Sequence, residues 1–472
     1  MSTTVEQLYT GCLSQGAYYI ESNGEAAVID PLRETAPYIE LAEQRGATIK
    51  YVLETHFHAD FVSGHVDLAR ATGATIVYGP NAETDYDVHV AQDGEVLELG
   101  DLQIKVLHTP GHTLESTTYL LIDEEGADHA IFTGDTLFLG DVGRPDLAIK
   151  QGELTQEDLA GMLYDSLRGK IMPLGDDVIV YPGHGAGSAC GKNLSTDTMD
   201  TLGNQKATNY ALRADMTRDE FIEEVTAGLV APPAYFPQNA MMNKRGYDRY
   251  DEVLERGMTA LSIDEVAELA EKDDVMILDT RHEHDVVRGF VPGSLFIGLD
   301  GRFAPWVGAM IPDVHQKLVL VTEPGREEEA VRRLARVGYD HALGYLNGGF
   351  EAWRTAGRPV DSIEEETADD LISRLGDVHV LDVRKASEHF SERLDVAHVE
   401  NVPLDVLRDR LSEIDPSQTH HLHCAGGYRS VIAATLLKAN GIDHLVNVAG
   451  GFDALRTSGA PVTDYVCPST ML

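Results

Sequence analysis

The chain has 472 residues, 43% of them hydrophobic and 24% charged, as in ordinary soluble globular proteins, and this length predicts two to four domains. Its 78 acidic residues against 37 Lys and Arg give a formal net charge of −41, which repels nucleic acid and anionic membrane surfaces. No apolar stretch approaches the roughly 20 residues that span a bilayer. We therefore expect a soluble, cytoplasmic protein without nucleic-acid or membrane partners, and composition leaves open whether its acidity reflects salt adaptation.

The first part of the chain alternates short strand-like runs with Gly-containing turns, which predicts a mixed, layered α/β fold. The N-terminus lacks a basic start followed by an apolar run, so no secretory signal is expected. We expect amphipathic helices at residues 35–45 and 66–72. Strands are expected at residues 26–30, 51–53, 75–78, 104–107, 129–132 and 178–181.

The densest chemical motif, H-F-H-A-D at residues 56–60, follows the apolar run at 51–53. Two imidazoles and a carboxylate at one strand end suit a first-row divalent metal ion. Three later fragments also place a His or Asp at a Gly-bearing turn after an apolar run, at His112, Asp135 and His184. A lone H-x-H would favour a polar loop, but four such fragments predict a metal site.

This order of motifs, H-x-H-x-D and then G-H, G-D and G-H, resembles the metallo-β-lactamase fold, and the resemblance implies an αββα sandwich with ligands along one edge. Members usually carry H-x-H-x-D-H, whereas this chain has Phe61 where the last His normally serves a second metal ion. The resemblance then implies a mononuclear site of His56, His112 and Asp135. Two imidazoles and one carboxylate with open positions are typical of non-haem Fe(II) enzymes that activate O2. We expect one Fe²⁺ per chain, as in the persulfide dioxygenases of this superfamily.

Four further side chains are expected in the pocket or in hydrogen-bonded contact with the ligands: His58, Asp60, His184 and Cys190. Without a second metal ion, His184 would line the pocket. Cys190 would touch the substrate sulfur, relay sulfur or stay inert, because its reactivity depends on its exposure. The G-R-P-D segment at residues 143–146 is expected to form a surface turn, with anion binding as the alternative.

A helical tail follows, with helix-like spacing at residues 204–213 and 217–229 and a capping-box pattern of Thr217 with Glu220. The proline-rich segment at residues 231–237 breaks any helix and alone would be a linker. The order of helix and P-P-x-Y-F-P is, however, similar to the C-terminal part of persulfide-dioxygenase domains. The first domain is therefore predicted to span residues 1–256.

The remaining chain contains an internal repeat at an offset of 102 to 103 residues. The motif L-D-T-R ending at Arg281 matches L-D-V-R ending at Arg384, and G-G-F-E-A and G-G-F-D-A follow in the same order. The repeat has the size of a domain and alternates strands with helices, which predicts two parallel-sheet α/β copies. These motifs resemble rhodanese domains. We assign the copies to residues 257–363 and 364–472, joined by the acidic stretch 361–370.

The second copy holds a chemical motif at Cys424, which follows the strand-like run at residues 421–423 and precedes A-G-G-Y-R and a helix at 431–439. The N–H groups of the loop and the helix N-terminus would face the sulfur and stabilise an anion, with Arg429 adding positive charge. The Cys–Arg spacing is one residue shorter than in Cys-dependent phosphatases and fits a single sulfur atom, as in active rhodaneses. Cys424 and Arg429 are therefore the expected catalytic residues, with an inert buried Cys as the alternative.

The first copy lacks this device, because Val321 or Thr322 aligns with Cys424. The acidic loop that follows has no thiol and would repel an anionic sulfur donor. We expect this copy to be catalytically inactive and to serve packing or orientation. Cys12 and Cys467 belong to no C-x-x-C pair and are expected to be structural or incidental, in a reducing compartment.

The order metallo-β-lactamase, inactive rhodanese, active rhodanese resembles fused persulfide dioxygenase–sulfurtransferases over nearly the whole chain. The resemblance implies that Fe(II) binds a thiol persulfide of the glutathione or coenzyme A type, that O2 binds beside it, and that oxidation releases thiol and sulfite. Cys424 would then pass a sulfane sulfur to sulfite, giving thiosulfate, in sulfide detoxification. The superfamily often dimerises, so a homo-oligomer is expected.

Two alternatives remain open. A zinc thioesterase of glyoxalase II type would share the fold, but it normally needs the His that is absent at position 61. A non-catalytic docking role for the rhodanese pair suits the first copy, whereas the intact loop at Cys424 speaks against it for the second.

Overall fold

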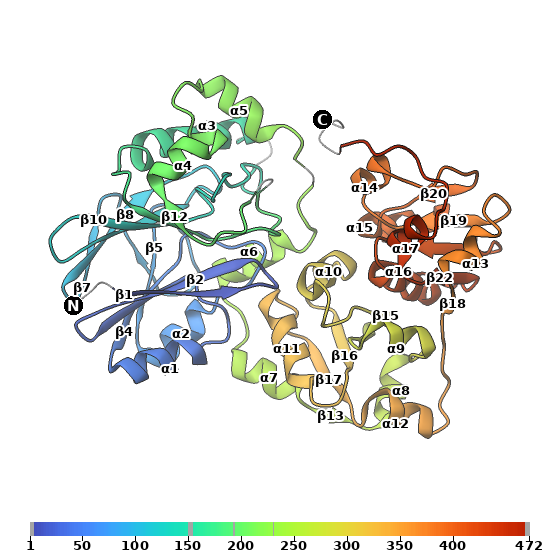
Figure 1. Cartoon of the computed structure of the whole chain (residues 1–472). Helices are drawn as coiled ribbons and strands as arrows, with labels where there is room; N and C mark the ends of the chain where they lie inside the picture. Colours follow the sequence, from blue (N-terminus) through green and yellow to red (C-terminus); the bar gives the residue numbers. More distant parts are fainter. Residues whose placement is uncertain (1–3, 150–153, 192–193, 230, 468–472) are drawn as a thin grey trace. The chain divides into compact units, whose positions relative to one another are not determined.

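The computed structural model describes residues 4–149, 154–191, 194–229 and 231–467 (Figure 1). The chain divides into two compact units: Met1–Tyr250 with Ala335–Gly338, and Asp251–Leu334 with Tyr339–Leu472. Within the described ranges, no helix is long and apolar enough to cross a membrane. The expected absence of a secretory signal rests partly on residues 1–3, which lie outside the described residues.

The first unit contains two six-stranded sheets. The first sheet runs in chain order, with antiparallel pairs up to β3 and parallel pairs from there on. Its strands are β1 (Thr4–Thr10), β2 (Gln15–Ser22), β3 (Glu25–Ile29), β4 (Thr48–Leu53), β5 (Thr75–Tyr78) and β6 (His89–Val90). The second sheet has the order β12-β11-β10-β9-β8-β7. Its strands are β7 (Val96–Leu99), β8 (Leu102–His108), β9 (Thr117–Ile122), β10 (Asp128–Gly134), β11 (Ile179–Pro182) and β12 (Asp200–Thr201).

Alternation along the strands gives each sheet two apolar faces. On β2, Tyr18 and Ile20 enter the core between the sheets, while Ala17 and Tyr19 face the core under the helices. Helices α1 and α2 lie on one side of this unit and α3, α4 and α5 on the other (Figure 1), which is the predicted αββα sandwich. The helices are α1 (Ala36–Arg45), α2 (His65–Thr72), α3 (Gln156–Ser166), α4 (Leu202–Thr208), α5 (Arg218–Thr226) and α6 (Phe236–Arg245), with a π-turn at Leu167–Ile171 and a 3₁₀ turn at Tyr210–Leu212.

The first helix of the tail is shorter than the prediction of residues 204–213. It ends at Thr208, because Asn209 has an extended backbone and a 3₁₀ turn follows. The side-chain amide of Asn209 donates to the carbonyl oxygens of Phe138 and Asp141, at 3.2 and 3.1 Å. These tertiary contacts override the helical spacing.

The rest of the tail also differs in part from the prediction. The capping box of Thr217 and Glu220 is present. The prediction that residues 231–237 break any helix is wrong at their end, because α6 begins at Phe236 with Pro237 in its first turn. Proline is tolerated there, since the N–H it lacks would have no helical partner.

The second unit contains two five-stranded parallel sheets with equivalent strand orders, β13-β17-β16-β14-β15 and β18-β22-β21-β19-β20. Strands at equivalent positions of the repeat therefore occupy equivalent places, as expected for two α/β copies. The predicted boundaries at residues 256 and 363 stay predictions. The strands are β13 (Ala260–Leu261), β14 (Val275–Asp279), β15 (Leu295–Phe296), β16 (Lys317–Val321), β17 (Ala342–Leu346), β18 (Glu364–Glu366), β19 (His379–Asp382), β20 (Val399–Asn401), β21 (His420–His423) and β22 (Leu445–Val448).

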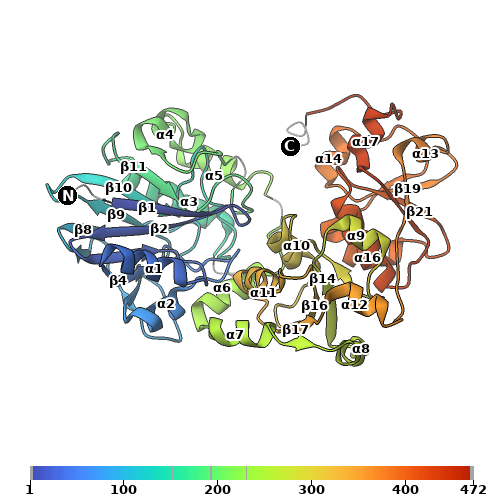
Figure 2. The same ribbon diagram turned by 60° about the horizontal axis from the view of Figure 1, so that its bottom comes forward.

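Helices flank the strands of each copy (Figure 2). In the first copy they follow α7 (Tyr250–Gly257) and are α8 (Ile263–Ala270), α9 (Glu283–Arg288), α10 (Phe303–Met310), α11 (Glu327–Arg336) and α12 (Gly349–Thr355). In the second copy they are α13 (Ala368–Ile372), α14 (Ala386–Ser391), α15 (Leu404–Leu407), α16 (Tyr428–Ala439) and α17 (Gly451–Thr457), with a 3₁₀ turn at Arg408–Glu413.

A buried Asp–Arg pair fixes the end of one central strand in each copy. Arg281 binds both carboxylate oxygens of Asp279 through Nε and Nη2, and Arg384 binds Asp382 in the same way. Each guanidinium lies over the Phe ring of the G-G-F motif of its own copy, at 4.2 and 3.8 Å from the ring centroid. The pair is therefore a feature of the scaffold that both copies retain.

The two copies meet along α16. The hydroxyl of Tyr428 donates to the carbonyl oxygen of Gly298 at 3.0 Å, and its ring packs edge-on against Phe296, with centroids 5.6 Å apart. The N–H of Phe296 donates to the hydroxyl of Thr435 at 3.0 Å. Segments of the first copy therefore hold both the first turn and the middle of this helix.

Candidate active sites

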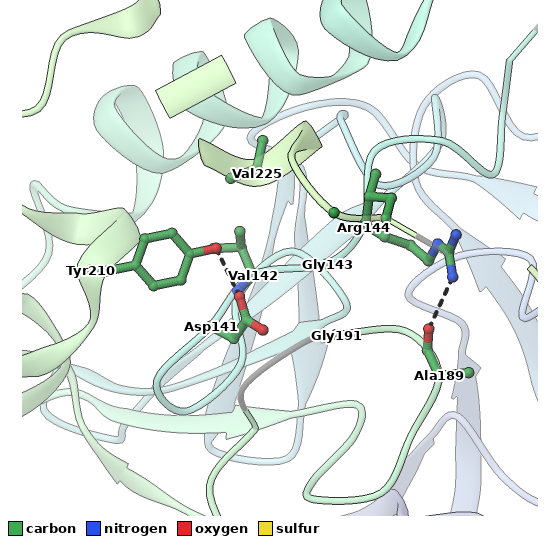
Figure 3. A pocket seen from close by; sticks show the side chains of 10 residues that line it. Asp141, Val142, Gly143, Arg144, Ala189, Gly191, Tyr210 and Val225 are labelled. Carbon is green, nitrogen blue, oxygen red and sulfur yellow. Dashed lines mark hydrogen bonds between the residues drawn. The ribbon is translucent and has the colours of Figure 1, made fainter. Parts of the chain in front are cut away.

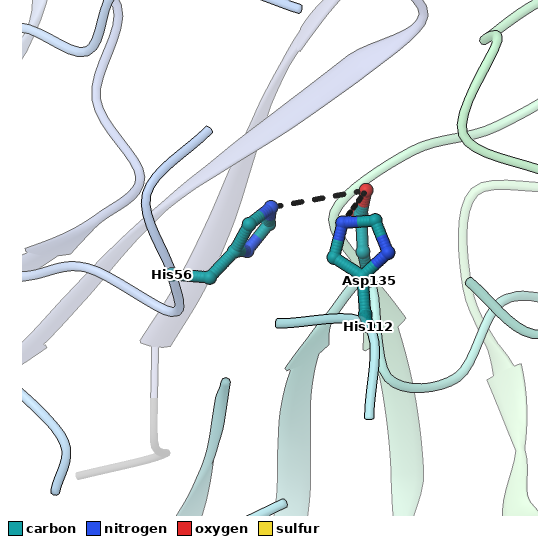
Figure 4. A group of neighbouring side chains, drawn as sticks. All are labelled: His56, His112 and Asp135. Atoms are coloured by element: carbon teal, nitrogen blue, oxygen red, sulfur yellow. Dashed lines mark ion pairs between the residues drawn. The ribbon is translucent and has the colours of Figure 1, made fainter. Parts of the chain in front are cut away.

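The side chains of His56, His112 and Asp135 come together at the ends of three strands, β4, β8 and β10 (Figure 4). Oδ2 of Asp135 lies 3.9 Å from Nε2 of His56 and 3.5 Å from Nε2 of His112. All three residues are at most 2% exposed. Two atoms that each lie about 2.0–2.2 Å from one ion are up to roughly 4 Å apart, so this spacing suits a shared metal ion.

Hydrogen bonds on the far side of each imidazole leave Nε2 free for a metal ion. The hydroxyl of Thr55 donates to Oδ2 of Asp30 at 2.8 Å, so it accepts the Nδ1–H of His56 at 2.9 Å. Nδ1 of His112 donates to the carbonyl oxygen of Arg144 at 2.9 Å. Such partners orient metal-binding imidazoles and fix their tautomer.

The electrostatics of the group also suit a cation. Burial, followed by nearby His58, lowers the pKa of His56 well below its usual value, so that its imidazole is neutral. Burial alone would raise the pKa of Asp135, but His184, His112 and His56 hold it far below its usual value. Oδ2 of this carboxylate is buried and accepts no hydrogen bond from any residue that the structure describes. The residues present therefore fit a divalent metal ion.

His58 lies with a different group. Its Nε2 is 3.1 Å from Oδ1 of Asp30 and 3.7 Å from Oε2 of Glu54, and burial followed by Asp30 raises the pKa of Glu54 well above its usual value. The ring of Phe61, fully buried, packs against the His58 ring with centroids 4.3 Å apart. The second His of the motif thus lies beside carboxylates that the prediction did not include.

Asp60, His184 and Cys190 form a second buried cluster, with donor atoms within 4.8 Å of one another. His184 binds Asp60 through Nε2 and Asp135 through Nδ1, each at 2.8 Å. Burial alone would lower the pKa of His184, but Asp135 and Asp60 raise it well above its usual value. Burial raises the pKa of the Cys190 thiol well above its usual value, which disfavours the reactive role considered for it.

A cavity of about 490 Å³ lies beside the metal-binding loop. Two of its lining residues, Phe57 and Ala59, alternate with His56 and His58 in the sequence. The proline-rich segment and α6 form another part of its wall, so this segment is more than a linker. The wall includes Phe57, Ala59, Thr113, Phe236, Met241 and Lys244.

The segment at residues 143–146 is not the surface turn that was expected, because Gly143 and Arg144 are buried. It lines a smaller cavity of about 130 Å³ (Figure 3). The guanidinium of Arg144 binds Asp146 through Nε and Nη2 at 2.6 and 2.8 Å, and Nη1 donates to the carbonyl of Ala189. Its charge is therefore already matched, which disfavours the alternative of anion binding.

In the second unit, the sulfur loop (residues 424–429) connects β21 to α16. The N–H of Gly427 donates to Sγ of Cys424 at 3.1 Å, and the hydroxyl of Ser430 lies 3.7 Å from the same sulfur. The loop therefore faces the sulfur as the sequence predicts. Arg429 instead directs its two terminal nitrogens at the carboxylate of Glu388, at 2.6 and 2.8 Å.

The first copy places Thr322 at the position of Cys424, because β16 ends at Val321 as β21 ends at His423. A cavity of about 440 Å³ remains there, lined by Thr322, Glu323 and Pro324. No cysteine lines it. The first copy thus has a cavity at this position without a sulfur nucleophile in its lining.

Sequence reasoning missed four polar residues around these sites: Asp30, Glu54, Thr55 and Glu388. Asp30 directly follows the apolar strand β3 and has a positive φ of 49°, which is uncommon for a non-Gly residue. A carboxylate at a strand end near the metal motif was a usable signal. Glu388 is one of 78 acidic residues in the chain, so its residue type alone gave no such signal.

Comparison with known families agrees with this architecture. The metallo-beta-lactamase superfamily matches residues 10–184, and the rhodanese-like domain matches residues 262–356 and 367–458. A metallo-beta-lactamase from Staphylococcus aureus subsp. aureus COL has a similar structure, with a TM-score of 0.64 and 31% identity over 73% of this chain and 98% of that chain.

Curated relatives resemble the first domain. A cytoplasmic hydroxyacylglutathione hydrolase of Arabidopsis thaliana is 35% identical over 178 residues, which are 37% of this chain and 65% of that protein. A mitochondrial persulfide dioxygenase of Homo sapiens is 34% identical over 163 residues, which are 34% of this chain and 59% of that protein. The chain thus spans less than two thirds of the length of these relatives.

Proposed function

Because the chain belongs to the metallo-β-lactamase superfamily and carries two rhodanese-like domains, we propose that it oxidises a low-molecular-weight thiol persulfide and also transfers sulfane sulfur. The first reaction consumes persulfide, O2 and water at one Fe²⁺ and yields thiol, sulfite and protons. The second passes sulfur through Cys424 to sulfite and yields thiosulfate. Together the reactions would detoxify sulfide.

The observation that carries this proposal is the buried cluster of His56, His112 and Asp135, with Nε2 of His58 beside Asp30 and outside that cluster. Two imidazoles and one carboxylate leave several coordination positions open, which suits non-haem Fe(II). Iron bound there would supply activation of O2. The likeness to a human persulfide dioxygenase over this domain supports the same chemistry.

The chain's own residues would position the substrate. Thr55 and the carbonyl of Arg144 hold the two imidazoles by their Nδ1 atoms, so that both Nε2 atoms face one point. The cavity beside Phe57 and Ala59 would hold the thiol part of the persulfide next to these ligands. Its largely apolar wall would also keep bulk water from the reacting sulfur.

At the second site the Cys424 thiolate would attack the outer sulfur of a persulfide. A new sulfur–sulfur bond forms at Cys424, the bond in the donor breaks, and the donor leaves as thiolate. The N–H of Gly427 and the hydroxyl of Ser430 would stabilise negative charge on Sγ. Sulfite then attacks the outer sulfur with its own electron pair, releasing thiosulfate and the Cys424 thiolate, so the exchange needs no oxidant.

Anaerobic purification followed by iron and zinc analysis tests the metal, and O2 uptake on glutathione persulfide tests the reaction. The proposal predicts about one iron per chain and O2 consumption with sulfite release. Zinc occupancy without O2 consumption would reject the oxygenase half. Coenzyme A persulfide in parallel would identify the preferred carrier.

The second candidate is a zinc thioesterase, favoured by the 35% identity to a hydroxyacylglutathione hydrolase. Phe61, in place of the usual second-metal His, speaks against it. Hydrolysis of S-lactoylglutathione in the absence of O2 would favour this candidate. A docking role for the inactive copy would be favoured if residues 259–360 captured another sulfur-handling protein.

A further inference from the structure

The guanidinium of Arg429, expected to add positive charge at the sulfur loop, is bound to a carboxylate. Its Nη1 and Nη2 bind the two carboxylate oxygens of Glu388 at 2.6 and 2.8 Å. Such paired contacts are among the stronger side-chain hydrogen bonds. Oε2 of Glu388 also accepts the N–H of Lys385 at 3.0 Å, which fixes the carboxylate at the start of α14.

The pair is only partly exposed, with 16% of the Arg429 side chain and 35% of the Glu388 side chain accessible. Burial alone would raise the pKa of Glu388, but Arg429 holds it below its usual value, so the carboxylate is charged. The hydrogen bonds from Glu388 raise the pKa of Arg429. Arg429 is therefore bound to a charged carboxylate.

The inactive copy provides an internal comparison. Asp285 stands four residues after Arg281, as Glu388 stands four residues after Arg384. The aligned loop of this copy differs from the sulfur loop, and Asp285 instead lies 3.6 Å from Arg288 on its own helix, in an exposed pair. The pair between the loop arginine and the acidic residue on the helix that follows the L-D-x-R motif therefore occurs in the second copy, whereas Arg326 of the first-copy loop binds both carboxylate oxygens of Asp300, each at 3.0 Å.

We propose that Glu388 determines which reactants reach Cys424, by competing with anions for the guanidinium of Arg429. An oxyanion such as sulfite must displace the carboxylate, whereas an uncharged reactant needs no contact with Arg429. Glu388 would thus weaken anion binding and keep the loop from retaining oxyanion products. This inference rests on the proposed transfer reaction at Cys424, and its test separates the two.

Alkylation of Cys424 in the full-length chain measures the effect without any sulfur transfer. Iodoacetate and iodoacetamide are alkylating reagents of similar size, the first anionic and the second neutral. The modified Cys424 peptide is quantified by mass spectrometry. Glu388→Gln removes the charge but keeps the shape. Loss of one partly exposed charge changes binding by roughly 1 kcal/mol, so we expect the iodoacetate-to-iodoacetamide rate ratio to rise about fivefold.

The matched control is Glu392→Gln, because Glu392 pairs with exposed Arg456 at 3.4 Å. Its ratio should equal that of the wild type. In turnover, Glu388→Gln should lower the KM for sulfite about fivefold and change the KM for cyanide, a smaller acceptor, much less. A purely structural role would slow both reagents by the same factor and leave the ratio unchanged.

The outcomes distinguish the inference from the proposed function. An unchanged or lower ratio in Glu388→Gln overturns the competition, even where thiosulfate is formed normally. A higher ratio without any thiosulfate formation in the wild type supports the competition and rejects sulfite as the acceptor. A rise in the ratio together with a lower KM for sulfite supports both.

Discussion

Asp30 holds Thr55 by two hydrogen bonds: Oδ1 accepts its backbone N–H and Oδ2 accepts its hydroxyl, each at 2.8 Å. The Thr55 hydroxyl donates its hydrogen to Asp30, so toward Nδ1 of His56 it can only act as an acceptor. A carboxylate at the end of β3 therefore sets the tautomer of a candidate metal ligand at the end of β4.

Thr55→Val should weaken metal binding, because it keeps the shape of the side chain but leaves Nδ1 of His56 without an acceptor. Loss of such a partner typically costs 10- to 100-fold in metal affinity. Anaerobic Fe(II) titration against a competing chelator measures the change. Thr72→Val is the control, since its hydroxyl donates to the carbonyl oxygen of Leu68 and accepts the N–H of Ala74, both local contacts at the end of α2. Unchanged affinity in Thr55→Val would mean that the ring is held by packing alone.

Cys424→Ser should abolish thiosulfate formation and leave O2-dependent sulfite release intact, because the two candidate sites lie in separate units. Sulfite and thiosulfate are measured in the same reaction by chromatography. Cys467→Ser, which changes an exposed thiol, should leave both products at wild-type levels. Persistent thiosulfate in Cys424→Ser would contradict the role given to this residue.

Tyr428→Phe should slow sulfur transfer, because it removes the hydrogen bond to Gly298 that anchors the first turn of α16. One such bond is worth about 1 kcal/mol, or roughly fivefold in rate if it acts fully on the loop. The kcat for transfer should fall while O2 consumption stays constant. Tyr339→Phe is the control, since its hydroxyl binds Ile311 inside the first copy. Equal effects in both variants would argue against a specific link between the copies.

His65 should make the first unit less stable in acid. Burial, with His58 and Arg33 nearby, lowers the pKa of His65 to about 3. In the unfolded chain His65 has its ordinary pKa of about 6.5 and binds a proton below that pH, whereas in the folded chain it stays neutral. The free energy of unfolding therefore decreases as the pH falls below about 6.5. The loss approaches 1.4 kcal/mol per pH unit.

The measurement is denaturant unfolding of the wild type and His65→Gln at several pH values between about 6.5 and 5. Over this range His65→Gln should lose about 2 kcal/mol less free energy of unfolding than the wild type does. The raised pKa of neighbouring Glu54 has the opposite effect, because its protonation in the folded state adds stability as the pH falls. His89→Gln, at an exposed histidine, should follow the wild type. Parallel curves for wild type and His65→Gln would contradict a buried neutral imidazole.

The fold was predictable where local pattern and tertiary packing agree. The strand Thr75–Tyr78 matches its prediction, and the repeat predicted two copies that have equivalent strand orders. The helix expected at residues 204–213 failed because Asn209 binds carbonyls far away in the sequence. Helix α6 was missed because proline was treated as a breaker without regard to its place in the first turn.

The sequence predicted which side chains gather at the candidate sites, but it predicted few of the residues that support them. His56, His112 and Asp135 carry chemistry in their residue types and follow strand-like runs, so the motif points to them. Asp30 supports His56 through a residue between them, and Glu388 meets Arg429 across 41 positions of sequence. Such pairings depend on how elements pack, which residue type and spacing do not encode.

The Asp–Arg pair that contacts the Phe of each G-G-F motif occurs in both rhodanese-like copies, whereas the cysteine occurs in one of them. Because the first copy has the same pair without a cysteine at the position of Cys424, the framework of the domain does not depend on the thiol. Two copies of one domain can therefore share the same framework while the loop that carries the catalytic cysteine differs between them. Because the framework and the loop are independent, the sulfur-loop residues could be introduced into the first copy to give it a reactive cysteine.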